Sequence, residues 1–133
     1  IYVMVIDPNA LLNDTLSIET ILLSDSENAI PNYSMPAKWF GGALGPDGYI
    51  YSIPNNYNAI LIIKPLSGNN NLELLSYAGY SGTESNKWRG AIVTSDNTIV
   101  GIPYNADAVL RINISPKNSF SDATVQSRFF NKL

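Results

Sequence analysis

Short apolar runs of about five residues alternate with turn-forming residues along most of this chain. Tyr49–Ile53 is rich in β-branched and aromatic residues and lies between two breakers, Pro46-Asp47-Gly48 and Pro54–Asn58, so it is predicted to be a strand. Ala59–Ile63 follows as an unbroken apolar run, which indicates a strand buried on both faces. One further predicted strand on each side completes a group of four: Gly41–Gly45 and Leu72–Tyr77.

This pattern occurs a second time, 49 residues later. Lys38–Lys64 aligns without a gap with Lys87–Asn113, and 11 of the 27 aligned pairs are identical. Four-stranded units that recur at a period near 50 residues are typical of β-propeller blades, which cannot bury their own faces and stack on neighbours. In the second copy the predicted strands are Ala91–Val93, Thr98–Ile102, Ala108–Asn113 and about Ala123–Phe130.

The beginning of the chain matches the same unit from its middle onward. Val3–Pro8 aligns with Ile60–Pro65 at an offset of 57, and Leu16–Leu23 is the predicted fourth strand. The fold class predicted is therefore all-β, a partial β-propeller of four-stranded antiparallel blades. About two and a half blades and about ten strands are expected: residues 1–37 form a half blade and connector, and residues 38–86 and 87–133 form one blade each.

Two and a half blades do not close a ring, and an open arc leaves sheet edges and a blade face uncovered. We therefore expect the chain to be a piece of a longer protein or to complete its ring with another chain. A start inside a predicted strand, without methionine, favours the first of these.

The repeated motif runs Lys-Trp-x-Gly, a turn, an Ile-Pro-x-Asn loop, and an Ile/Leu/Val strand. It resembles the Kelch-like β-propeller repeats of uncharacterised microbial and protist proteins. The resemblance covers Lys38–Pro65 and Lys87–Asn113 well and Tyr2–Pro8 partially. It implies binding rather than catalysis, because Kelch-like propellers mostly hold partners. The second copy departs from the motif at the Thr94–Asn97 turn and at Asn113-Ile114, which replaces Lys64-Pro65.

Composition excludes several classes of function. The net charge is −3 and the eight basic residues are scattered, so we expect no nucleic-acid partner, which would need clustered cations. The chain has no cysteine and no histidine, so it lacks thiolate nucleophiles and any Ser-His-Asp arrangement. Its apolar runs are too short for a membrane span. No cofactor or metal site is expected, and nothing in the sequence assigns a compartment.

Residues identical in both copies are best explained by what every blade needs. Trp39 and Trp88 are expected to be wedges between blades, with a stacking platform for a sugar or base as the alternative. Gly41 and Gly90 begin the innermost strand, where close backbone approach explains a glycine. Two further pairs are expected to bond the nearby backbone in turns and loops: Asp47/Asp96 and Asn56/Asn105.

Positions that differ between the copies are the candidate partner-binding residues. Arg89 replaces Phe40 beside the tryptophan, and Arg111 replaces an isoleucine within an apolar strand. Each arginine is either an exposed side chain of an outer or terminal blade, or a contact to an anion or partner near the channel mouth. Tyr57 and Tyr104 lie in the loops after the repeated Ile-Pro pair, as interface aromatics or as ordinary loop packing.

The first functional hypothesis is a non-enzymatic scaffold or binding module that holds a protein partner, or the rest of its own propeller, as part of a larger assembly. The second is a fragment of an enzyme whose catalytic groups lie on missing blades, or whose two carboxylates meet at the channel. The third is a structural element of a surface or particle. No catalytic residue is named, because the carboxylates closest in sequence, Asp25 and Glu27, lie in a polar connector.

Overall fold

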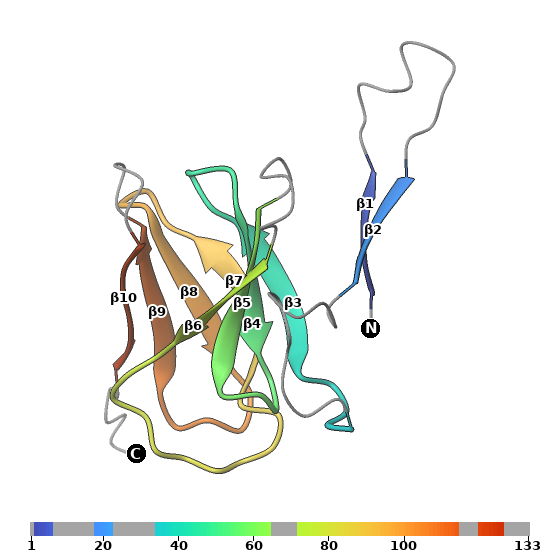
Figure 1. The fold of residues 1–133 in the computed structure, drawn as a ribbon. Helices are drawn as coiled ribbons and strands as arrows, with labels where there is room; N and C mark the ends of the chain where they lie inside the picture. The colour runs from blue at the N-terminus through green and yellow to red at the C-terminus, as the bar shows by residue number, and fades with distance from the viewer. Residues whose placement is uncertain (1, 7–17, 23–33, 65–71, 115–119, 127–133) are drawn as a thin grey trace.

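The computed structural model describes residues 2–6, 18–22, 34–64, 72–114 and 120–126. These residues form ten strands in three antiparallel sheets and contain no helix (Figure 1). The all-β prediction and the expected number of strands are therefore confirmed, whereas the propeller arrangement stays a prediction. Accordingly, the described part of the chain offers no helix that could cross a membrane.

Each sheet follows the order of its strands along the chain. The first sheet pairs β3 (Trp39–Leu44), β4 (Ile50–Pro54), β5 (Ala59–Ile63) and β6 (Leu72–Ser76). The second sheet pairs β7 (Trp88–Val93), β8 (Thr98–Pro103), β9 (Val109–Ile114) and β10 (Phe120–Gln126). A separate two-stranded sheet consists of β1 (Tyr2–Ile6) and β2 (Ile18–Leu22).

The predicted strand positions agree with these bounds at most places. The bounds of β5 coincide with the apolar run, and all five of its residues are buried, as its unbroken pattern indicated. The first strand of each unit begins earlier than expected, at Trp39 and at Trp88. In both cases an irregularity in the pairing follows the tryptophan, so the strand resumes in register only at Gly42 or Ala91.

The two tryptophans are held by the same hydrogen bond in their respective sheets. Trp39 Nε1 donates to the carbonyl of Ala59 at 2.8 Å, and Trp88 Nε1 donates to the carbonyl of Ala108 at 2.7 Å. Each bond ties the first strand to the start of the third strand across the second. Because donor and acceptor are both offset by 49 residues, the sequence repeat corresponds to a repeat of local structure.

Gly41 and Gly90 occupy the irregular positions after the tryptophans. Their φ angles are +71° and +70°, a left-handed conformation that costs other residues about 1–2 kcal/mol. A Cβ atom on Gly41 would lie 2.9 Å from the Cα of Gly90, whereas a Cβ on Gly90 would meet nothing within 4 Å. The expected close approach of backbones is thus found on the Gly41 side, at the contact between the two sheets.

The main core lies between the sheets, which meet through unlike faces. The first sheet presents its front face, formed by Tyr51, Ile53, Ile60 and Ile62, and all four side chains are buried. They join one cluster with the rear face of the second sheet: Trp88, Ile99, Leu110 and Ile112. The rear face of the first sheet carries the residues 49 positions earlier, namely Trp39, Ile50, Leu61 and Ile63, in a separate small cluster. The sheets therefore stack front to rear.

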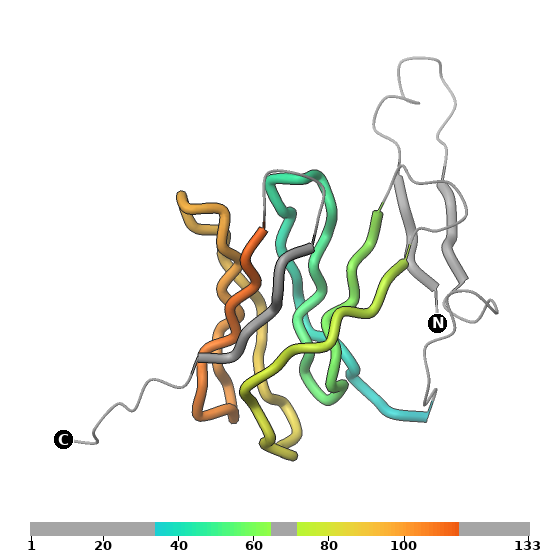
Figure 2. Tube along the Cα trace, turned by 60° about the vertical axis from the view of Figure 1, so that its left-hand side comes forward, coloured from blue at the N-terminus to red at the C-terminus, as the bar shows by residue number. Residues whose placement is uncertain are grey.

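Contact between the two sheets is concentrated at one edge. The strands in closest backbone contact across them are β3 with β7, followed by β4 with β7. Figure 2 shows the sheets as successive layers along the chain. Since β3 and β7 are the first strands of their sheets, equivalent edges lie together.

One buried tyrosine, Tyr51, and two half-buried ones, Tyr77 and Tyr80, predict a loss of stability in alkali. Burial raises the pKa of Tyr77 from 10.0 to about 12, and Tyr51 and Tyr80 shift in the same direction, also chiefly through burial. Above pH 10 the tyrosines of the unfolded chain ionise before those of the folded chain. The part of the free energy of unfolding that depends on neutral tyrosines is therefore fully present below pH 10 and is lost as the pH rises toward 12. We expect tyrosinate absorbance to develop late and together with unfolding. Tyr77→Phe should weaken the pH dependence; an unchanged profile would contradict this.

Candidate partner-binding site

The start of β7 brings together two of the four predicted partner-binding residues. The guanidinium carbon of Arg89 lies 3.8 Å from the centroid of the Tyr104 ring and 5.0 Å from that of Phe40. Both rings are largely exposed, whereas Arg89 is half-buried. Stacking on aromatic rings stabilises a guanidinium by cation–π attraction. Arg89 is therefore held between an aromatic side chain from each sheet.

A hydrogen-bond network leads from this arginine through Asn86 to Asn55. Arg89 Nη2 donates to Asn86 Oδ1 at 3.2 Å, and the same oxygen accepts from Asn55 Nδ2 at 3.2 Å. Asn55 Nδ2 also donates to the carbonyl of Ala37 at 3.0 Å. Asn55 belongs to the loop after β4, so this network joins the first sheet to the second.

Two polar atoms of the network are buried without a hydrogen-bond partner among the described residues: Asn55 Oδ1 and Arg89 Nε. One is an acceptor and the other a donor. An unsatisfied buried polar group costs about 1–3 kcal/mol, so the cluster is more polar than stacking of the sheets alone requires. Together with the two exposed rings, these atoms mark the Arg89–Tyr104 cluster as a candidate contact for a partner.

Backbone hydrogen bonds cross between the sheets next to this cluster. Lys87 N donates to the carbonyl of Asn55 at 3.0 Å, and Asn86 N donates to Asn56 Oδ1 at 2.7 Å. The side chain of Asn56 also reaches back to the carbonyl of Pro36 at 2.9 Å. The sequence predicts local bonds for this asparagine, whereas its side chain bonds the backbone of the segments that precede the first strands of both sheets. Asn105 makes the equivalent bond to Ser85 in the second sheet.

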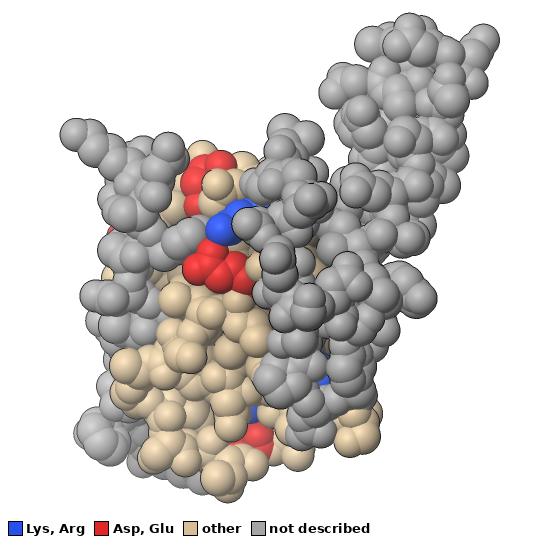
Figure 3. Space-filling view, viewed as in Figure 1, with Lys and Arg blue, Asp and Glu red and all other residues tan. Residues whose placement is uncertain are grey.

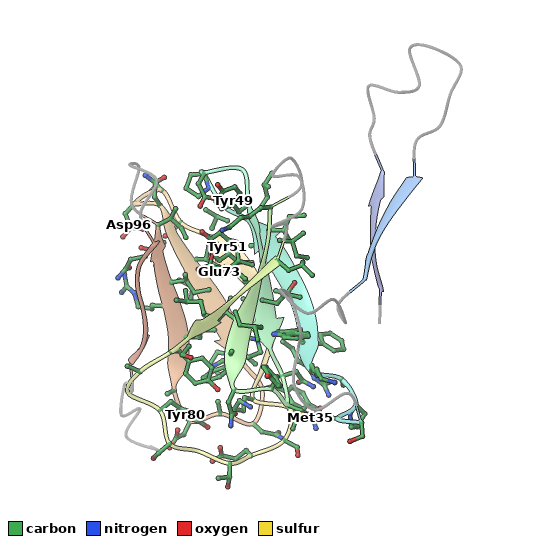
Figure 4. The ribbon with its side chains drawn as sticks, viewed as in Figure 1. Met35, Tyr49, Tyr51, Glu73, Tyr80 and Asp96 are labelled. Atoms are coloured by element: carbon green, nitrogen blue, oxygen red, sulfur yellow. The ribbon has the colours of Figure 1, made fainter. Side chains whose placement is uncertain are left out.

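Arg111 lies apart from this cluster. Its Nη2 is 3.9 Å from Asp96 Oδ2, and both side chains are partly exposed, so this ion pair contributes little stability. Asp96 belongs to the turn between β7 and β8, at the opposite end of the sheet from Tyr80 in Figure 4. Arg89 lies near the start of β7, whereas Arg111 is in the middle of β9, opposite Val100, so the two arginines are not neighbours in the second sheet.

Tyr57 also lies apart, on the rear side of the first sheet. Its ring is 5.2 Å from the Trp39 ring, at an interplanar angle of 54°, and it adjoins the small cluster of Leu61, Ile63 and Leu72. This geometry is that of loop packing. The two tyrosines grouped by the sequence therefore have different surroundings.

A cavity of about 270 Å³ lies at the end of the sheets labelled by Tyr80 in Figure 4, between the β6–β7 connector and the start of β9. Its lining includes Tyr80, Glu84 and Asp107, and Tyr80 donates to Glu84 Oε2 at 2.7 Å. That bond is the main reason why the pKa of Glu84 is lowered. Burial lowers the pKa of nearby Lys87, and Glu84 partly offsets this. The two carboxylates give the cavity hydrogen-bond acceptors.

Charged groups are otherwise sparse on the face seen in Figure 3, where blue and red side chains adjoin near the upper end and most of the described surface is tan. Within the first sheet, Lys64 Nζ and Glu73 Oε2 form an ion pair 2.6 Å apart. The described residues contain no group of three acidic side chains that could hold a metal ion. Asp25 and Glu27, considered as carboxylates in the sequence, lie outside the described residues.

The sequence reasoning missed Asn55 and Asn86 as members of the site. One available signal was that Tyr104 stands where the first copy has Asn55. A second signal was the position of Asn86 directly before the repeated Lys-Trp pair. Asn86 adopts φ +58° there, a conformation that asparagine tolerates better than most residues.

Comparison with known proteins leaves the chain without an assigned family. No family model matches it, and neither the curated proteins nor the solved structures give a match. The resemblance to Kelch-like repeats therefore stays a prediction from the motif residues.

Proposed function

We propose that this chain is part of a non-enzymatic β-propeller scaffold in which each four-stranded sheet is one blade. The single observation that supports this most strongly is the front-to-rear stacking of the two sheets with equivalent edges together. Blades around a common axis must meet in this way, because every blade presents one face to the preceding neighbour and the other face to the next.

The scaffold holds a protein partner through the end of the second sheet that carries the Arg89–Tyr104 cluster. Arginine and tyrosine are enriched where protein interfaces gain most of their binding energy. The stacked guanidinium is held in place before binding, so little of its conformational entropy remains to be lost. In this proposal the chain contributes its blades to a larger assembly, and the partner is protein rather than nucleic acid.

Distances between spin labels test the blade arrangement. The chain lacks cysteine, so two double variants can be labelled without background: Leu44→Cys/Val93→Cys on β3 and β7, and Glu73→Cys/Thr124→Cys on β6 and β10. Blades that radiate from an axis predict a shorter distance for the inner pair than for the outer pair. Equal distances would indicate a sandwich of parallel layers, in which facing sheets stay about 10 Å apart, and would overturn the proposal.

A further inference from the structure

The front face of the second sheet lacks the cover that the first sheet has. The positions equivalent to the first sheet's front face lie 49 residues later. They carry side chains that are not fully buried: Val100, Ile102, Val109 and Arg111. Ile53 of the first sheet is 0% exposed, whereas its equivalent Ile102 is 47% exposed. Gly90 shows the same difference, since it has open space where Gly41 meets the next sheet. Within the described residues, the stack ends with an apolar face open to solvent.

The rear face of the first sheet has the chemistry that fits such a front face. Its Trp, Ile, Leu and Ile are the same four residue types as those of the second sheet's rear face, position by position. Trp88 and Ile99 are 0% exposed, but their equivalents Trp39 and Ile50 keep partial exposure. The contact inside the chain joins a front face to a rear face. An equivalent front face lies on the outer side of the second sheet, and an equivalent rear face lies on the outer side of the first sheet.

We infer that a second copy of this chain docks through the rear face of its first sheet onto the front face of the second sheet. The inference rests on the proposed function and names the partner. Gly90 leaves room for Gly41 of the second copy, as Gly41 and Gly90 already fit within one chain. Asn105 Oδ1 corresponds to Asn56 Oδ1, which accepts from a backbone N–H of the next sheet. Tyr104 takes the place of Asn55 beside this contact.

Such a contact joins unlike surfaces, so it propagates from copy to copy and either closes into a ring or extends as a filament. Sedimentation and native mass spectrometry of the 133-residue chain over a range of concentrations should show oligomers. Ile102→Asp places a charge in the apolar contact and should weaken assembly by about tenfold or more. Ser95→Asp adds the same charge at an exposed turn position and should leave assembly unchanged. A chain that stays monomeric at all concentrations overturns the inference.

Cross-linking between two single variants determines which faces meet. Mixed Ile102→Cys and Ile50→Cys chains, treated with a short bismaleimide, should link to each other, while Ile102→Cys alone should not link to itself. Self-linking of Ile102→Cys would mean that two front faces meet, and would overturn the inference. Circular dichroism of each variant shows whether it is folded. The spin-label distances are measured within one chain, so a monomer with a shorter inner distance refutes the second copy while the blade proposal stands.

Discussion

Trp88→Ala is expected to lower the free energy of unfolding by about 3–5 kcal/mol, the usual cost of removing a buried aromatic side chain. Trp88 is fully buried, and its ring lies 5.4 Å from Tyr77 and 5.0 Å from Tyr80. The substitution opens a cavity between the sheets and also leaves the carbonyl of Ala108 without its indole donor.

Trp39→Ala is the matched control. It removes the same side chain and the equivalent hydrogen bond to Ala59, but from a ring that is only partly buried on the rear face of the first sheet. We expect a clearly smaller loss of stability. Urea denaturation followed by far-ultraviolet circular dichroism, at a protein concentration low enough to exclude association, measures both values. Equal losses would show that the rear faces of the two sheets are covered to the same extent.

The second large effect is expected for alanine at Gly41. Both glycines have φ near +70°, so Gly41→Ala and Gly90→Ala share the backbone cost of about 1–2 kcal/mol. Only at Gly41 does the added methyl group collide with backbone of the neighbouring sheet. Overpacking of this kind costs typically about 1–3 kcal/mol more. The difference in unfolding free energy between the two variants therefore isolates the contact between the sheets.

Equal destabilisation by these two variants, measured in the monomer, would contradict the close approach of β3 and β7. In the assembled protein the comparison changes, because Gly90→Ala should then also weaken association of a second copy. Thermal denaturation of the monomer and the dissociation constant of the oligomer separate the two effects.

Much of the fold could be predicted from local pattern. The apolar run Ala59–Ile63 stands between clear breakers, and the structure places β5 on these residues. The starts of β3 and β7 could not be found in this way, because a glycine after the tryptophan signals a break. A left-handed glycine instead allows the strand to bulge and continue back to Trp39 and Trp88.

The candidate site was predictable only in part. Comparing the two copies identified Arg89 and Tyr104, but not their contact, since they are 15 positions apart in sequence with a turn between them. Whether two such residues meet depends on how β7 and the loop after β8 lie in space. Tyr57 and Arg111 were identified by the same comparison, yet their neighbours are Trp39 and Asp96. A difference between copies locates variable positions without indicating which of them come together.

Front-to-rear stacking has a consequence for how a protein of this kind can grow. Tandem duplication of the 49-residue segment would produce a new unit whose two sides already match those of its neighbours. No compensating substitutions would be needed at the junction. Gene duplication alone could therefore lengthen the array, and selection could then diversify the loops of each added unit independently.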